Sequence, residues 1–227
     1  TAAALRAEGI DAEAGRHDIE RIAAAGHVVV SPGVPPTAPP LVAARAHGVP
    51  VISEIEVALR ALPGVPYVGI TGTNGKTTVT AMIAHLLRAL GHETVEAGNI
   101  GTPLSTVALA ERRPTWVVIE LSSFQLHDTP SVAPTVAVLT NLAPDHLDRY
   151  AALEEYYGDK QLLFRNATAA SIRVVQRRTR RTTAAQRARR RAAHGRYADS
   201  TRRRTPARHR PRNHPRSRAA TARPAPA

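Results

Sequence analysis

A glycine-rich loop between a strand and a helix constrains the fold of this chain more than any other feature. Residues 67–70 form a short apolar run that predicts a buried strand, and the loop after it reads Gly72-Thr73-Asn74-Gly75-Lys76-Thr77. Apolar residues then recur at helical spacing up to Gly91, which predicts a long amphipathic helix. Backbone N–H groups of such a loop converge at the helix N-terminus and bind phosphate oxygens. This order of elements therefore predicts a nucleotide-binding α/β unit.

The residue types in the loop suit the phosphates of ATP. Glycines allow close approach of the backbone, Lys76 supplies a cation for the outer phosphates, and the Thr77 hydroxyl is placed to ligate Mg²⁺. The spacing is shorter than the standard phosphate loop, because position 70 is Ile rather than Gly. Helix capping alone explains the loop poorly, since the helix dipole disfavours a lysine in the first turn. The predicted ATP-binding residues are Gly72, Thr73, Asn74, Gly75, Lys76, Thr77 and Thr78.

Short apolar strands alternate with helical patterns as far as residue 164, which predicts an α/β fold with a parallel sheet. A proline-containing linker at 63–66 divides this part. We expect a partial Rossmann-like N-terminal domain at 1–62 and a truncated phosphate-loop central domain at 63–165. From residue 166 the apolar pattern stops, so residues 166–227 are predicted to be a disordered Arg-rich tail.

The net charge of +13 comes from that tail. Residues 165–227 hold 20 Arg, no Lys and one acid, whereas residues 1–164 carry 11 Lys and Arg against 17 Asp and Glu. A basic tail could bind nucleic acid non-specifically by neutralising phosphates. The alternative is a reading-frame error in a GC-rich gene, which yields Arg, Ala, Pro, Thr and His. The absence of Lys favours the frame error.

Several classes of protein are excluded by composition. The chain has no cysteine, which excludes disulfides, thiolate metal sites and cysteine nucleophiles. No apolar run approaches the length of a membrane span, and the N-terminus lacks the pattern of a signal peptide. The chain starts without Met and within a helical pattern, so we expect a fragment of a cytoplasmic protein with no membrane partner.

Polar residues follow two further predicted strands. Glu120 comes directly after the apolar run 116–119, and the run 140–148 follows the apolar run 136–139. Ligands of open parallel sheets bind at the carboxyl ends of the strands, so Glu120 is well placed to hold nucleotide-bound Mg²⁺. His146, flanked by Asp145 and Asp148, is a candidate metal ligand or general base, although a lone histidine is often structural.

Four separated motifs closely resemble the Mur ligases. They are the loop at 71–78, Glu96-Ala97-Gly98-Asn99-Ile100-Gly101, the run 120–126 and the run 141–148, within a resemblance that spans about residues 10–164. The string Leu-Ser-Ser-Phe-Gln-Leu at 121–126 is similar to the D-glutamate-adding branch of that family. The resemblance implies an ATP-dependent amide ligase that joins D-glutamate to UDP-N-acetylmuramoyl-L-alanine through an acyl phosphate, in peptidoglycan precursor synthesis.

The resemblance also implies roles for single residues. Lys76 would stabilise the transferred phosphate, Thr77 and Glu120 would ligate one Mg²⁺, and Asn99 would contact nucleotide phosphate or substrate. His146 would ligate a second metal, together with Lys160 converted by CO₂ to a carbamate. The alternative for Lys160 is a solvated helix lysine.

A complete ligase of this family needs a further domain, so this chain is expected to be an inactive fragment. The alternative function is an ATP-binding remnant with a nucleic-acid-binding tail.

Overall fold

The computed structural model describes residues 2–146 and 149–176. Asp148 and the segment 177–227 lie outside these residues, so the expectations for them stay predictions. The elements in chain order are α1 (Ala2–Ala7), α2 (Ile19–Ala23), β1 (Val28–Val30), α3 (Pro39–Ala46), β2 (Val51–Ser53), α4 (Glu54–Ala61), β3 (Tyr67–Thr71), α5 (Lys76–Ala89), β4 (Thr94–Gly98), α6 (Leu104–Leu109), β5 (Trp116–Glu120), α7 (Ser123–His127), β6 (Val136–Leu139), α8 (Leu153–Gln161), the 3₁₀ turn η1 (Leu162–Phe164) and β7 (Ile172–Val175).

A five-stranded sheet carries the phosphate loop. Its strand order is β4-β5-β3-β6-β7, and every neighbouring pair is parallel, which confirms the predicted α/β class. Strand β3 is central and all five of its residues are buried, so the loop that leaves it starts from a rigid position. The chain leaves β3 towards β4 on one side and later returns to β6 on the other, and ligands bind at such reversals of strand order.

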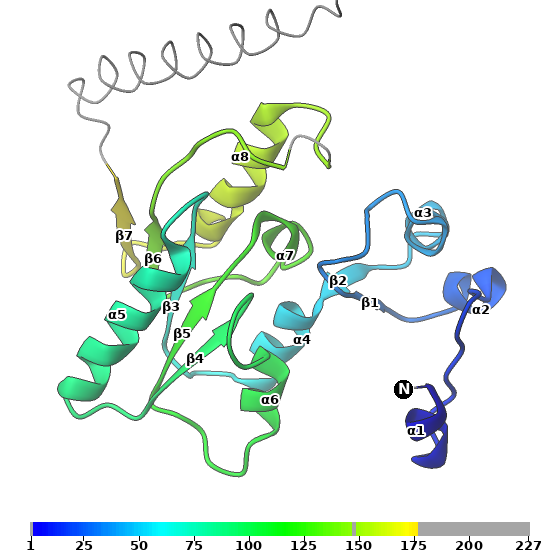
Figure 1. The fold of residues 1–227 in the computed structure, drawn as a ribbon, viewed down its shortest axis with the longest axis horizontal. Coiled ribbons are helices and arrows are strands. Elements are labelled where there is room, and N and C mark those ends of the chain that lie inside the picture. The colour runs from blue at the N-terminus through cyan, green and yellow to red at the C-terminus, as the bar shows by residue number, and fades with distance from the viewer. Residues whose placement is uncertain (1, 147–148, 177–227) are drawn as a thin grey trace, which may run out of the picture. The chain divides into compact units, whose positions relative to one another are not determined.

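Helices cover both faces of this sheet. Figure 1 shows α5 on one side and α4, α6 and α7 on the other. The α5 side packs Ile83 and Leu87 against a small core that includes Ile70 and Val118. The opposite core is larger and includes buried residues of α4, α6 and α7. No helix among the described residues is long and apolar enough to cross a membrane.

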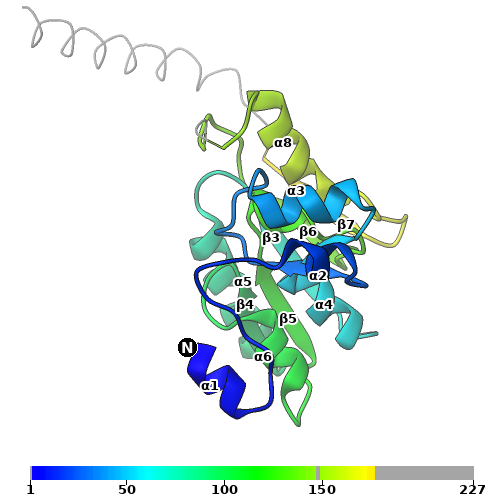
Figure 2. The same ribbon diagram turned by 90° about the vertical axis from the view of Figure 1, so that its right-hand side faces the viewer.

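The N-terminal part contains a second, two-stranded parallel sheet formed by β1 and β2. Figure 2 shows α2 next to α3, and α3 contacts β2 of this sheet. The Ser53 hydroxyl caps α4 by accepting from the N–H of Glu56, and α4 then buries Ile55 and Ala58 in the larger core of the central sheet. The domain boundary at residue 62 remains a prediction, but α4 on its N-terminal side packs with the central sheet.

The central sheet continues past residue 165, the predicted end of the central domain. Residues 172–175 form β7, which extends the sheet by pairing with β6 from Val136↔Ile172 to Leu139↔Val175. The segment Ile172-Arg173-Val174-Val175 is β-branched at three of four positions, a strand signal that the surrounding arginines and alanines obscured. The central domain therefore has at least one more strand than its predicted boundary includes.

Candidate functional site

The glycine-rich loop has the geometry needed to surround a phosphate. Gly72 has φ of 143°, and Gly75, the residue before α5, has φ of 80°, both in the region that favours glycine. A Cβ on Gly72 would lie 2.0 Å from the Thr140 hydroxyl, so no larger residue fits there. Within the described residues, the N–H groups from Gly75 to Thr78 have no backbone or side-chain acceptor. These free donors at the start of α5 are suited to an anion.

The N–H groups earlier in the loop are already bonded. Thr73 N donates to the Asn141 carbonyl at 2.9 Å, and Asn74 N donates to the Asn141 side-chain oxygen at 3.1 Å. The Thr73 hydroxyl exchanges hydrogen bonds of 3.0 Å with the backbone of Ala143. The N–H groups of Thr73 and Asn74 are thus bonded to the segment after β6, whereas those of residues 75–78 are free to bind a ligand.

Lys76 lies over the loop. Its Nζ donates to the carbonyl oxygens of Gly72 and Thr73, at 3.1 Å each. Neither partner is a carboxylate, so the charge of Lys76 is not neutralised by these contacts and remains able to attract phosphate oxygens.

Three residues predicted from separate motifs lie together, namely Glu120, Thr77 and Asn99. The Thr77 hydroxyl donates to Glu120 Oε2 at 2.8 Å, and Asn99 Nδ2 donates to Glu120 Oε1 at 3.1 Å. Strand register explains this, because Glu120 pairs with Ile70 on β3 and with Gly98 on β4. Glu120 is only 2% exposed, so a carboxylate is held next to the first turn of α5. A carboxylate beside a hydroxyl fits Mg²⁺, which takes oxygen ligands and completes its shell with phosphate and water.

Lys160 is a buried lysine rather than a solvated one. It is 2% exposed, its Nζ donates to the Gly72 carbonyl at 3.0 Å, and it lies 4.5 Å from the centre of the Tyr156 ring. Burial, and then the nearby charge of Lys76, lower the pKa of Lys160 to about 8. A lowered pKa favours the neutral form of the amine, which is its nucleophilic form.

Within the described residues, His146 makes no hydrogen bond to Glu120 or Lys160, but its ring lies beside Tyr156, which Lys160 also contacts. His146 has φ of 51°, and its ring contacts Phe124 and Tyr156 with centroid separations of 5.3 and 5.9 Å. Its Nε2 is 3.8 Å from Asp145 Oδ2. In the part of the chain that is described, no three His, Asp or Glu side chains gather as a metal site would require. The metal-binding role of His146 therefore remains a prediction.

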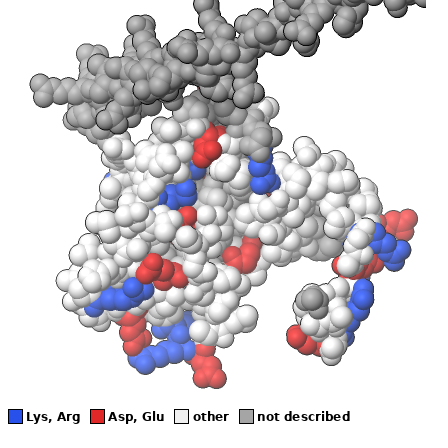
Figure 3. Space-filling model, viewed as in Figure 1, with Lys and Arg blue, Asp and Glu red and all other residues white. Residues whose placement is uncertain are grey.

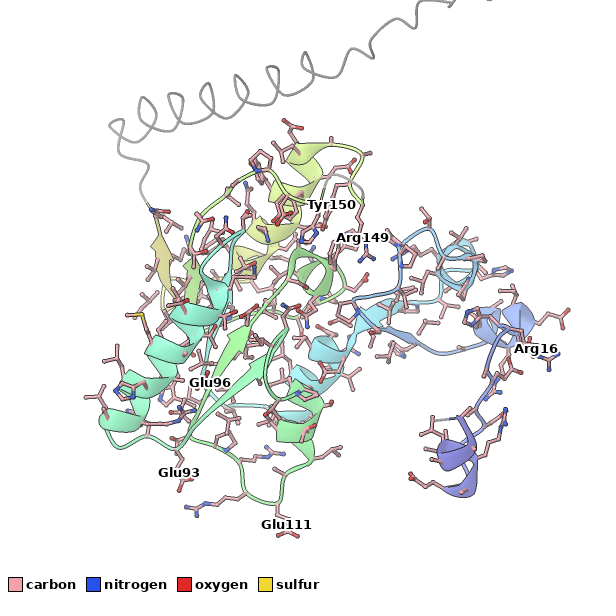
Figure 4. The ribbon with its side chains drawn as sticks, in the orientation of Figure 1. Arg16, Glu93, Glu96, Glu111, Arg149 and Tyr150 are labelled. Carbon is pink, nitrogen blue, oxygen red and sulfur yellow. The ribbon has the colours of Figure 1, made fainter. Side chains whose placement is uncertain are left out.

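A cavity of about 400 Å³ lies between the turn after β1 and helices α7 and α8, and its lining includes Phe124 and Gln125 of the 120–126 run. Arg149 joins the two sides, because its guanidinium lies 4.2 Å from the centre of the Phe124 ring and donates to the Pro32 carbonyl at 3.3 Å. Figure 4 shows Arg149 and Tyr150 close to α7 and α8. The cavity lining includes the charged or polar residues Ser31, Arg45, Ser53, Gln125, His127, Asp128, Arg149, Glu155 and Asp159.

A hydrogen-bonded network closes the α8 side of that cavity. Asp159 accepts from the Tyr150 hydroxyl at 2.9 Å and is 3.0 Å from His127 Nδ1. The bond to Asp159 raises the pKa of His127. The cavity thus combines apolar walls with both signs of charge, as sites for polar substrates do.

Comparison with known proteins decides the family. Residues 70–210 match the Mur ligase middle domain. This chain belongs to the Mur ligase family. The resemblance predicted from the four sequence motifs is thereby confirmed, while the roles of single residues within them remain predictions.

Curated relatives of this Mur ligase chain include D-glutamate ligases. It is 46% identical over 171 residues to the UDP-N-acetylmuramoylalanine–D-glutamate ligase of Desulfatibacillum aliphaticivorans, a match that covers 75% of this chain and 38% of that protein. It is 48% identical over 166 residues to the enzyme of the same name from Geotalea uraniireducens, covering 73% and 36%. The chain therefore spans less than two fifths of the length of these relatives.

Among solved structures, the UDP-N-acetylmuramate:L-alanyl-γ-D-glutamyl-meso-diaminopimelate ligase of Neisseria meningitides is similar at 23% identity. The TM-score is 0.49, and the match covers 78% of this chain and 60% of that one.

Proposed function

We propose that this chain is the nucleotide-binding part of an ATP-dependent ligase that joins D-glutamate to UDP-N-acetylmuramoyl-L-alanine. The observation that carries the proposal is the convergence of Lys76, Thr77 and Glu120 at the carboxyl ends of β3 and β5. Identity of 46–48% to D-glutamate ligases supports the choice of amino acid.

The loop would hold the phosphates of ATP. The free N–H groups of residues 75–78 and the Lys76 ammonium would bind the outer phosphates and stabilise charge as the γ-phosphoryl group moves to the substrate carboxylate. Thr77 and Glu120 would hold Mg²⁺, with Asn99 fixing the Glu120 carboxylate. When bound, Mg²⁺ neutralises charge on the phosphate oxygens.

The chemistry after phosphoryl transfer is amide formation. The amine of D-glutamate attacks the acyl carbon, a C–N bond forms as the C–O bond to phosphate breaks, and the nitrogen loses a proton as inorganic phosphate leaves. Such a step needs the amine and acyl phosphate held at near-attack distance.

Lys160 would contribute as a carbamate. The ammonium first loses a proton, the neutral amine then attacks CO₂, an N–C bond forms as one C–O π bond opens, and the nitrogen loses a second proton. The product would be a buried anion able to bind a second metal with His146. The buried position and the lowered pKa of Lys160 favour this reaction.

The cavity near α7 and α8 would take part of UDP-N-acetylmuramoyl-L-alanine. Arg45 and Arg149 line it and can pair with anionic groups of that substrate, while its apolar wall suits the remainder.

Nucleotide binding by the purified chain tests the proposal. We expect Mg²⁺-dependent binding of ATP by calorimetry, lost in Lys76→Ala and retained in Arg88→Ala. Arg88 is the matched control because it is a cation of the same helix whose side chain pairs with Glu96, away from the loop. Equal affinity in both variants, or no ATP binding by the wild type, would refute the assignment of the loop.

A second experiment tests the cavity. UDP-N-acetylmuramoyl-L-alanine should raise the melting temperature of the wild type and have a smaller effect on Arg149→Ala. An identical shift in both proteins would exclude the cavity as the substrate site.

A further inference from the structure

The side chain of Asn141, just after β6, forms hydrogen bonds with both backbone polar groups of Asn74 in the phosphate loop. Asn141 Oδ1 accepts from Asn74 N at 3.1 Å, and Asn141 Nδ2 donates to the Asn74 carbonyl at 2.8 Å. A primary amide is the side chain that can supply one acceptor and one donor in this geometry without a charge. This pair of hydrogen bonds therefore resembles the pairing of two neighbouring strands in a sheet, except that a side-chain amide takes the place of one strand.

Neighbouring bonds direct the same segment onto the loop. The Thr140 hydroxyl donates to the Asn74 carbonyl at 2.8 Å, and the Asn141 carbonyl accepts from Thr73 N at 2.9 Å. The glycine at position 72 allows this approach, because a Cβ there would collide with Thr140.

The direction of the free donors depends on the Asn74 peptide. Residues 72–75 lie between β3 and α5, so no ladder or helix holds their peptides. Two bonds from Asn141 to Asn74 fix the residue directly before Gly75, where the free N–H groups start. Rotation of that peptide would turn these donors away from a common centre.

We infer that Asn141 is a positioning residue for the phosphate loop, holding the Asn74 peptide so that the N–H groups of residues 75–78 converge on bound phosphate. This inference rests on the proposed ATP site. A neutral amide is suited to the task, since a carboxylate at position 141 would turn an acceptor towards the Asn74 carbonyl and place negative charge near the phosphates.

The test compares Asn141→Ala with Asn166→Ala. Asn166 is the matched control, because its Nδ2 also bonds backbone carbonyls, those of Pro130 and Val132, at 2.8 and 2.9 Å, and does so away from the loop. Calorimetry with Mg·ATP should show about tenfold weaker binding for Asn141→Ala and wild-type affinity for Asn166→Ala. Equal losses in the two variants, or wild-type affinity in both, would overturn the inference.

Hydrogen exchange of the Asn74 amide, measured by NMR without nucleotide, gives a second and independent readout. Its protection should fall about tenfold in Asn141→Ala, stay unchanged in Asn166→Ala, and be restored in Asn141→Asp, which keeps the acceptor. Asn141→Asp should still bind Mg·ATP more weakly than the wild type.

Unchanged protection in Asn141→Ala contradicts the inference whatever the affinities are. If the wild type binds no ATP, the proposed function is refuted. The exchange protection of the Asn74 amide then still shows whether Asn141 fixes the loop.

Discussion

Replacing Lys160 by Met should remove a rise in folding stability that the wild type shows as the pH increases from 7 to 9.5. The cause is the position of the Lys160 ammonium, which is buried, bonded to one carbonyl and close to the like charge of Lys76. The pKa of Lys160 is about 8 in the folded chain and 10.5 for an ordinary lysine. Below pH 8 both states are protonated, and folding carries the full cost of burying the charge.

The direction of the change follows from proton counting. Between pH 8 and 10.5 the unfolded chain binds more protons at this site than the folded chain, so stability increases with pH. Each unit of pKa difference corresponds to about 1.4 kcal/mol, which gives a total of about 3 kcal/mol for the buried lysine. Up to pH 9.5 about 2 kcal/mol of this should be gained.

Urea denaturation in CO₂-free buffer measures the effect, since CO₂ would convert the amine. The quantity of interest is the free energy of unfolding of the wild type minus that of Lys160→Met, at each pH. Arg88→Met serves as control, because it removes an exposed basic side chain that pairs with Glu96 and not with the groups around Lys160. Tyr67, whose pKa burial raises to about 12, titrates above the range in the folded chain.

A difference between wild type and Lys160→Met that stays constant from pH 7 to 9.5 would refute the reasoning. It would mean that Lys160 is solvated and fully protonated throughout, which would also remove the physical basis for its carbamate.

Substitutions at Gly72, Glu120 and His127 test other parts of the site. Gly72→Ala should lower the free energy of unfolding by roughly 1–3 kcal/mol, because its Cβ would overlap Thr140 at a φ of 143°; urea midpoints equal to those of the wild type would contradict the loop geometry. Glu120→Gln should weaken the Mg²⁺ dependence of ATP binding, because the neutral amide is a poorer ligand than the carboxylate, and an unchanged Mg²⁺ titration would exclude Glu120 as a ligand. His127→Gln should lose a stabilising contribution that is complete below the ordinary histidine pKa and fades as pH rises through the raised folded pKa; thermal melts from pH 5 to 8 that run parallel to the wild type would argue against the bond to Asp159.

The parts of the site that the sequence predicted are those fixed by strand ends. Lys76 and Glu120 lie just beyond apolar runs, and parallel strands bring their carboxyl ends to one edge, so adjacency in space could be inferred from a linear pattern. The burial of Lys160 could not be predicted from its helix, because α8 has a weakly apolar face and its burial depends on contact with Gly72.

Other features escaped prediction for different reasons. Helix α7 was missed because five residues are too few for a helical repeat of apolar residues, although the capping box of Ser122 and Gln125 is a local signal for its start. Strand β4 has few apolar residues and is held by pairing with β5, so no local signal identifies it. The bonds of Asn141 to the loop join residues 67 positions apart and depend wholly on the tertiary fold.

Charge distribution limits what the described part can bind without specific contacts. Figure 3 shows that acidic and basic side chains on the visible face are interspersed, without a broad basic area among the coloured residues. This face of the described residues therefore offers no broad basic area to a nucleic acid.

The carbonyl of Gly72 accepts from both lysines of this chain, since Lys76 and Lys160 are the only two. An anion that draws Lys76 Nζ off this oxygen removes a like charge from beside Lys160 and adds an attractive one, so the proton affinity of Lys160 rises. Binding of nucleotide near pH 8 should then be accompanied by proton uptake, and its measured heat should vary with the ionisation enthalpy of the buffer. By reciprocity, the chain should bind the same anion more weakly when Lys160 is unprotonated. The contacts of both lysines with the Gly72 carbonyl oxygen would therefore couple the protonation of Lys160 to the binding of nucleotide.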